Sequence, residues 1–568
     1  MRTPISSSHN LRETLTSTRR GTAHPICCVT CNEESTVTYV RCCAANMALK
    51  GSHMHARVNR REVTKWMLSA SIGSLAAERL SASTASFNGA NSSAEFRSIR
   101  HRIQQSISRG DATGVAIAVI EGGRIVWEEG FGWASREAAL RATPHTPFSM
   151  ASITKPFTTT TLMTLVAEGR FSLDKPANRS LLGSKIIGKN GDPNAATVRM
   201  LGAHVSGLPG MYESYDADEA KLVPSADVLL EEYGRLAYPP ATCYEYSNIG
   251  YVALGAIASG LTQTELGPLM HRAVLSPLGL NDSFFGSDNV RVRDAATRYD
   301  PLGHAIPHCA TSTPASGELY ASAHDLAQFI LFNMGHRVQS PATILSKIDI
   351  DELHRPVFVG QSGVASTFGW FTSHTASGVP FFFKIGGDPG VANRVFFVPS
   401  KGLACVVVTN QSNAGELAYS VCDEVMKSKL PEWRRPIEDC GSRSVPFIGG
   451  PSYRGRWVGA LEDGGANMPI VLDIASGQSA TLAIGSNRAE EITEMRTEGE
   501  AFTGTCSGRI NSPDAIRARA KTLKLKLLLS GDSLVGRVFA VAGDPNFKNA
   551  SLPYVLNLSR SRASDERA

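Results

Sequence analysis

The segment Ser152-Ile153-Thr154-Lys155 leads directly into an apolar-periodic run that extends to Val166. The run predicts a buried helix that ends near Gly169. Ser152 and Lys155 are three residues apart, so they share one face of that helix. A serine at a helix start lies beside free backbone N–H groups and the positive end of the helix dipole. A lysine held there out of water has a lowered pKa and can accept the serine proton. The sequence therefore predicts that Ser152 is a nucleophile and Lys155 its activating partner.

A second copy of the pattern, Ser172-Leu173-Asp174-Lys175, serves as an internal comparison. It follows the helix-ending Gly169 and runs into Pro176, so we expect a surface turn there. Asp174 would also keep the neighbouring lysine charged. The pattern alone is therefore weak, and a helix-capping serine beside a surface lysine is the structural alternative at Ser152.

Two further segments strengthen the prediction. In Tyr246-Ser247-Asn248 an extended backbone would project the phenol and the amide to one side, where they can relay a proton and orient a substrate. The apolar strand 382–385 then ends in Lys384-Ile385-Gly386-Gly387, where glycines allow a substrate to approach the backbone.

Taken in this order, the three segments resemble the motifs Ser-x-x-Lys, Tyr-x-Asn and Lys-Thr-Gly or His-x-Gly of the serine β-lactamase and penicillin-binding protein family. The nearest branch holds class C β-lactamases, D-peptidases and esterases, and the resemblance covers residues 95 to 425. It implies an α+β fold: an antiparallel sheet flanked by helices, an all-helical lobe, and then a small β-barrel. Hairpin strands at 114–120 and 124–127 and at 394–399 and 403–409 agree with an antiparallel sheet.

The resemblance also implies roles. Ser152 would be the nucleophile, Lys155 its activator and Tyr246 the general base, with Lys384 supplying positive charge. Asn248 would hold the substrate amide or carbonyl, and Ile385 and Gly386 would border the substrate. The backbone N–H groups of Ser152 and Gly387 would form an oxyanion hole. No metal or other cofactor is required.

The chain departs from the family pattern at Ile385, where β-lactamases carry a hydroxyl residue that binds the substrate carboxylate. Isoleucine cannot form that hydrogen bond. We therefore expect an ester or a D-amino-acid amide as substrate, with β-lactam hydrolysis weaker. Two alternatives stay open: a penicillin-binding or acyl-trapping protein without turnover, and a transacylase of the same fold.

The chain divides by composition into five parts. Residues 1–53 are polar and aperiodic, which indicates a disordered or non-native leader. Residues 54–91 combine Arg60-Arg61, a short apolar run and small residues, as in a twin-arginine export signal. Residues 92–430 form the hydrolase region, the proline-rich stretch 431–447 is a predicted linker, and short alternating strands in 448–568 resemble a lipocalin-like domain. We accordingly expect a periplasmic or secreted protein.

Composition excludes several other classes. The net charge is +5, from 57 basic and 52 acidic residues, too small and too dispersed to predict nucleic-acid binding. No apolar stretch in the predicted mature region is long enough to span a bilayer. Five of the 11 cysteines crowd the first 43 residues without usual zinc-finger spacing. The expected partner is a small ester, amide or β-lactam, and the sequence does not predict an oligomeric state.

Overall fold

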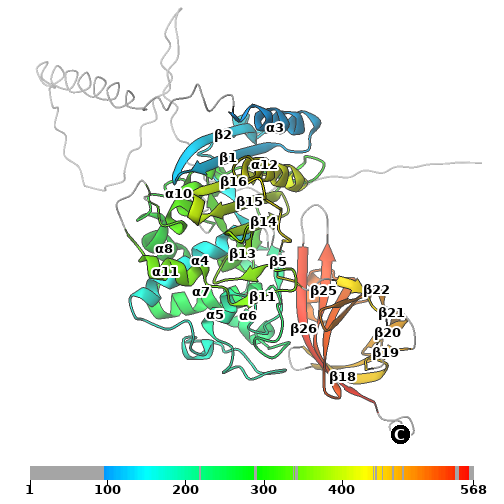
Figure 1. Ribbon diagram of the computed structural model, residues 1–568. Coiled ribbons are helices and arrows are strands. Elements are labelled where there is room, and N and C mark those ends of the chain that lie inside the picture. Colours follow the sequence, from blue (N-terminus) through cyan, green and yellow to red (C-terminus); the bar gives the residue numbers. More distant parts are fainter. Residues whose placement is uncertain are drawn as a thin grey trace, which may run out of the picture. The chain divides into compact units, whose positions relative to one another are not determined.

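The computed structural model describes residues 95–561, apart from short gaps at 216–218, 287–290, 337, 339–342, 439, 442–443, 449, 451, 464–465, 476–478 and 544–548. The predicted leader (1–53) and the predicted export signal (54–91) therefore lie outside the described residues. The predicted fold class is confirmed: helices and antiparallel sheets share the chain (Figure 1).

A nine-stranded antiparallel sheet forms the framework of the hydrolase region. Its strands run in the order β11-β12-β13-β14-β15-β16-β1-β2-β3. Their bounds in that order are Phe358–Val359, Ala365–Ser366, Phe371–His374, Pro380–Asp388, Val391–Val398, Leu403–Thr409, Gly114–Glu121, Arg124–Ser135 and Leu140–Arg141. The first hairpin, β1–β2, and the last, β15–β16, meet at the centre, where Ile117 pairs with Val407.

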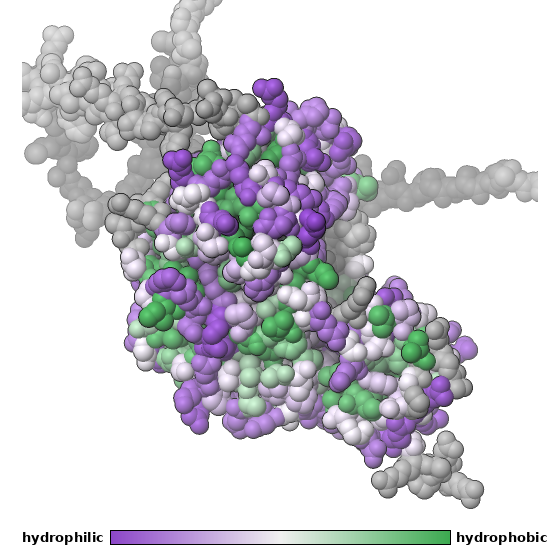
Figure 2. All heavy atoms as spheres, viewed as in Figure 1, coloured by the Kyte–Doolittle hydropathy of each residue, from purple (hydrophilic) through white to green (hydrophobic). Residues whose placement is uncertain are grey.

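Both faces of this sheet are covered, so its central strands are apolar throughout. In β1, Val115, Ile117 and Val119 belong to one core cluster and Ala116, Ala118 and Ile120 to another. Helices α3 (Arg97–Arg109) and α12 (Gly415–Lys429) pack on the first face. Side chains at the outer positions of α3 are polar, and this part of the surface is mostly hydrophilic (Figure 2).

The second face carries the helical lobe. It contains α4 (Thr154–Ala167), α5 (Val198–Gly202), α6 (Ala226–Tyr233), α7 (Asn248–Thr262), α8 (Leu266–Met270), α9 (Pro314–Gly317), α10 (Ala323–Asn333) and α11 (Lys347–His354). Helix α4 is buried on all sides, with Phe157 stacked on Phe329 of α10 at a ring distance of 3.7 Å. A small sheet of β4 (Phe148–Ser149), β10 (Leu319–Ala321) and β6 (Phe284–Phe285) joins this lobe to the start of the Ser152 segment.

The C-terminal strands form a second, strongly paired antiparallel sheet. Its main path is β17-β22-β23-β24-β25-β26-β18-β19-β20-β21. The bounds in that order are Ser444–Pro446, Thr493–Glu498, Ala501–Ser507, Thr522–Ser530, Ser533–Gly543, Asn549–Arg560, Gly455–Asp463, Ala466–Ile474, Ala480–Ile484 and Glu490–Glu491. Alternate residues of β24, Leu523, Leu525 and Leu527, are buried, which gives the sheet an apolar inner face.

This C-terminal sheet continues into the hydrolase region. Strand β26 pairs with β5 (Tyr212–Tyr215), which in turn pairs with β9 (Ala310–Thr311). The stretch 431–447, a linker by composition, is anchored as well, because Trp433 is fully buried at a ring distance of 4.7 Å from Phe381.

Candidate active site

Ser152 lies at the entrance to helix α4, in a single 3₁₀ turn (Ala151–Ile153). The preceding residue, Ala151, has a φ of +46°, a left-handed conformation that is rare outside glycine. Met150 donates its N–H to the Leu319 carbonyl (2.8 Å), which fixes the approach of the chain. Such strain at one residue is retained where the surrounding structure holds it, and here it directs the partly exposed Ser152 away from the core.

Two side chains contact the Ser152 oxygen. The Tyr246 hydroxyl donates to Ser152 Oγ at 2.8 Å, and Lys155 Nζ donates to the same oxygen at 3.2 Å. Lys155 Nζ also donates to the Ser316 carbonyl at 3.1 Å. Lys155 is fully buried, and burial, assisted by the charge of Lys384, holds its pKa well below the usual range. The arrangement therefore joins a serine hydroxyl, a phenol and a readily deprotonated amine.

Asn248 lies two residues after Tyr246 but in a different backbone setting from the one predicted. The sequence predicts one extended segment; instead Ser247 caps helix α7, its hydroxyl accepting from Gly250 N, and Asn248 is the first helical residue. That part of the prediction is wrong because the capping serine starts the helix between the two side chains. Asn248 Nδ2 donates to the Met211 carbonyl (2.8 Å), and within the described structure its Oδ1 is buried without a hydrogen-bond partner.

Lys384 approaches from β14, the strand that passes beside the Ser152 turn. Its Nζ lies 5.8 Å from the centre of the Tyr246 ring and 4.4 Å from that of Phe371. Burial lowers the Lys384 pKa to about 7. Gly386 allows the close passage of β14, since a Cβ there would stand 2.4 Å from the Met150 carbonyl oxygen. Gly387, exposed, lines the cavity.

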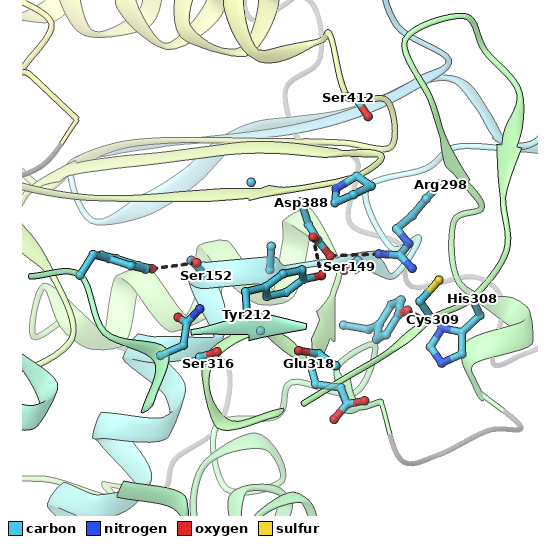
Figure 3. A pocket seen from close by; sticks show the side chains of 18 of the residues that line it. Ser149, Ser152, Tyr212, Arg298, His308, Cys309, Ser316, Glu318, Asp388 and Ser412 are labelled. Atoms are coloured by element: carbon cyan, nitrogen blue, oxygen red, sulfur yellow. Dashed lines mark hydrogen bonds and ion pairs between the residues drawn. The ribbon is translucent and has the colours of Figure 1, made fainter. Parts of the chain in front are cut away.

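A cavity of about 580 Å³ opens over Ser152 (Figure 3). Of the residues predicted from the sequence, Ser152, Tyr246, Asn248 and Gly387 line it, whereas Lys155 and Lys384 lie behind its wall. Ile385 and Gly386, predicted to border the substrate, are not among the lining residues. Ile385 instead packs beside the core cluster beneath α3 and α12, because alternate residues of β14 point to opposite faces.

His204 is a site residue that the sequence reasoning did not single out. Its ring stacks on Tyr246 at 4.2 Å, and its Nδ1 accepts from Ser247 N at 3.0 Å. Burial and the neighbouring lysines hold its pKa well below the usual range, so the ring is neutral. The sequence signals were its place in the Gly/Pro-punctuated stretch 201–210 and in the segment 204–209, which resembles the family branch.

The far end of the cavity is polar and was also missed. Asp388 accepts from the Tyr212 hydroxyl (2.8 Å) and from Arg298 Nη1 (3.1 Å), and Figure 3 shows this group beyond Ser152. Glu318 lines the same cavity, and burial raises its pKa to about 7. These residues come from four distant stretches, so no local pattern could have revealed them.

One group of potential metal ligands occurs within the described part of the chain: Glu128, His145 and His324, whose ligand atoms lie within 4.8 Å of one another. His324 Nδ1 is 2.8 Å from Glu128, and His145 Nδ1 is 2.8 Å from Asp282. None of these residues lines the cavity over Ser152.

No helix of the described residues is long and apolar enough to cross a bilayer.

The chain matches the Beta-lactamase family model over residues 99–420, and it therefore belongs to this family of β-lactamase-fold hydrolases. Among curated proteins, Protein flp of Staphylococcus aureus (strain COL) is 24% identical over 314 residues, covering 54% of this chain and 61% of that protein. Unguisins hydrolase ungD' of Aspergillus campestris is 25% identical over 369 residues, 59% of this chain and 67% of that protein.

Solved structures extend the likeness to most of the described chain. SurE superposes with a TM-score of 0.56 at 19% identity, covering 81% of this chain and all of that one. The octameric penicillin-binding protein homologue from Pyrococcus abyssi superposes with a TM-score of 0.50 at 20% identity, covering 81% of this chain and 99% of that one. A class C β-lactamase gives 0.50 at 18% identity but covers 60% of this chain and 98% of that one. The first two matches thus extend past the hydrolase region.

Proposed function

We propose that this protein is a serine hydrolase that cleaves an ester or amide bond through an acyl-enzyme on Ser152. The observation that carries the proposal is the convergence of the Tyr246 hydroxyl and Lys155 Nζ on Ser152 Oγ, at 2.8 and 3.2 Å. A serine hydroxyl is a weak nucleophile until a neighbouring base takes its proton, and both neighbours here are within hydrogen-bond reach.

In acylation the ionised form of Tyr246 is the base: Ser152 Oγ attacks the substrate carbonyl carbon while its proton passes to the Tyr246 phenolate oxygen. Lys155 and Lys384 flank the Tyr246 ring, at 4.7 and 5.8 Å from its centre, so a proton on either lysine stabilises the phenolate. Collapse of the tetrahedral intermediate breaks the ester or amide bond, and the leaving alcohol or amine takes the proton from Tyr246.

In deacylation, the Tyr246 phenolate takes a proton from water, and the water oxygen attacks the acyl carbon. The bond between that carbon and Ser152 Oγ then breaks, and Tyr246 returns the proton to Ser152. The backbone N–H groups of Ser152 and Gly387, both at the cavity wall, would stabilise the oxyanion in each step. The Asn248 amide, whose Oδ1 has no partner in the described structure, would hold a substrate N–H.

The cavity favours substrates without a carboxylate. Ile385 replaces the hydroxyl residue that binds the carboxylate in β-lactamases, and its side chain faces the core. Among the described residues that line the cavity, Arg298 is the one arginine, and it is paired with Asp388. Glu318 adds a negative charge above a pH of about 7. A short-chain carboxylic ester or a D-amino-acid amide meets these conditions better than a penicillin.

We further propose that the protein is exported by a twin-arginine signal and that the mature enzyme, which carries Ser152 and Gly387, begins near residue 86. In that enzyme, residues 448–568 would form a lipocalin-like domain that follows the hydrolase region 92–430. The signal rests on Arg60-Arg61 and the apolar run after them. Fractionation of cells that express the chain, with Arg60 and Arg61 changed together to Lys, tests the route: the unchanged chain should leave the cytoplasm and the variant should remain there.

The enzymatic test is an initial-rate comparison on a short-chain p-nitrophenyl ester, D-alanine p-nitroanilide and nitrocefin. Ser152→Ala should abolish turnover, and Ser172→Ala, in the exposed second copy of the motif, should leave it unchanged. Equal activity of wild type and Ser152→Ala would overturn the proposal. Labelling of Ser152 by a fluorophosphonate without turnover of any substrate would identify the acyl-trapping alternative, and fast nitrocefin hydrolysis would show that the substrate argument is wrong.

A further inference from the structure

Glu245, the residue before Tyr246, is a buried carboxylate held by two cations of the C-terminal sheet. Arg537 Nε of β25 lies 2.8 Å from Glu245 Oε1, and Lys526 Nζ of β24 lies 3.2 Å from Oε2. All three side chains are largely buried. A buried carboxylate is tolerated when both oxygens are paired in this way, and the two cations lower its pKa despite its burial.

The C-terminal sheet is built to receive an anion at this point. Lys526 and Arg537 are direct cross-strand neighbours in the β24–β25 pair. Like charges placed opposite each other destabilise a sheet unless an opposite charge lies beside them. Glu245 supplies that charge, and Glu498 of the same sheet lies further from Lys526, at 3.6 Å. We call Lys526 and Arg537 the cationic clamp.

The clamp also contacts the backbone of the residue before Glu245. Lys526 Nζ donates to the Tyr244 carbonyl at 3.4 Å, and the Tyr238 hydroxyl donates to the Lys526 carbonyl at 3.0 Å. On the opposite side, Glu245 N donates to the His204 carbonyl at 3.0 Å. The short segment that carries Tyr246 is thus fixed between the C-terminal sheet and His204.

We infer that the cationic clamp of the C-terminal sheet consists of positioning residues for Tyr246, so that this sheet completes the active site of the hydrolase region. The inference rests on the proposed function, in which Tyr246 moves the Ser152 proton. Proton transfer depends on heavy-atom separation, and the 2.8 Å contact between the two oxygens depends on where the segment 244–247 is held. A displacement of about 1 Å of a reacting group costs on the order of 100-fold in rate.

Two other contacts between the C-terminal part and the hydrolase region do not involve this segment. Lys189 pairs with Glu462 of β18, and the Tyr233 hydroxyl donates at 2.7 Å to Asp514, which lies in the short helix α13 (Pro513–Arg517). They hold the sheet against the hydrolase region without touching Tyr244, Glu245 or Tyr246. The Lys189 pair therefore offers a matched control for general attachment.

The test compares Arg537→Met with Lys189→Met in the full chain, measuring kcat and KM separately on the best chromogenic substrate. We expect Arg537→Met to lower kcat by about 10- to 100-fold with little change in KM, and Lys189→Met to leave both unchanged. Arg537→Lys should restore part of the loss. Unchanged kcat in Arg537→Met, or an equal loss in Lys189→Met, would overturn the inference.

A triple variant separates positioning from the harm of an unpaired buried charge. Glu245→Met, Lys526→Met and Arg537→Met together remove every charge of the group, so the protein should fold stably. A low kcat in this folded variant supports positioning, whereas recovery to the wild-type kcat refutes it. If the wild type turns over no substrate, the proposed function fails, and the rate of fluorophosphonate labelling at Ser152 then gives the same comparison among the variants.

Discussion

Replacing Lys384 by methionine gives the sharpest test of how charge is used at this site. Lys384 is buried, its pKa is lowered to about 7, and its Nζ lies 5.8 Å from the centre of the Tyr246 ring. At an effective dielectric constant of about 20, two unit charges about 6 Å apart interact by about 3 kcal/mol. A protonated Lys384 therefore stabilises the Tyr246 phenolate, the form that accepts the Ser152 proton, by an amount that corresponds to about 100-fold in its population and hence in rate.

The sign of the pH dependence follows from the lowered pKa. Below pH 7 Lys384 is protonated and exerts its full effect, and above pH 7 it loses the proton and the effect with it. The ratio of kcat/KM between wild type and Lys384→Met should approach about 100 near pH 6 and decline towards one above pH 8.

The assay measures this ratio on the same p-nitrophenyl ester from pH 5.5 to 9. Titration of shared groups that do not interact with Lys384 cancels in the ratio, whereas Lys155, whose pKa the Lys384 charge lowers, is titrated separately in each protein. Lys175→Met, in the exposed second copy of the motif, serves as the control and should give a ratio of one throughout. A ratio that does not change with pH, or wild-type activity in Lys384→Met, would refute the electrostatic role given to Lys384.

Three further predictions concern buried groups around the cavity. Between pH 7 and 10.5 the unfolded chain binds a proton at Lys384 that the folded chain does not. Calorimetry should therefore show a melting temperature several degrees higher for Lys384→Met than for the wild type at pH 7, and no difference near pH 10.5. His204→Ala removes the ring stacked on Tyr246 and should lower kcat about tenfold. His354 is also a buried, neutral histidine stacked on an aromatic ring, so the control His354→Ala should lower the melting temperature but not kcat. Equal losses of kcat in the two variants would contradict the prediction. Between pH 4.5 and 7 the folded state holds a proton on Glu318 that the unfolded state has released. Glu318→Gln should therefore raise the melting temperature by a few degrees above pH 7 and leave it unchanged at pH 4.5. An equal change at both pH values would contradict the raised pKa of Glu318.

The sequence predicted the local elements of the site because their signals are local. The apolar period after Lys155 specifies α4, and the apolar run from Phe382 to the glycines 386–387 predicts the strand that the structure has at Pro380–Asp388. The fold class followed from antiparallel hairpins and from the order of three motifs. The boundary at Asn248 was misjudged because a single capping hydroxyl, Ser247, outweighs the extended pattern around it.

What could not be predicted depends on tertiary contact. Asp388 pairs with Arg298 across 90 residues, and Glu245 pairs with Arg537 across 292. Nothing in the sequence around His204 indicates that its ring stacks on that of Tyr246. Ile385 was placed near the substrate by motif position, although the period of the strand turns it towards the core.

The pairing of β1 with β16 has a consequence for how the chain acquires its structure. Val115 meets Thr409 and Ile120 meets Ala404, so the middle of the main sheet joins segments almost 300 residues apart. During synthesis β1 and its hairpin partner β2 emerge early, yet the other partner of β1, strand β16, appears only after most of the hydrolase region has been made. Contacts of such long range slow folding and leave apolar edges exposed meanwhile. The proposed twin-arginine route would export the protein only after it has folded. Such a route suits a chain in which β1 can pair with β16 only late in synthesis.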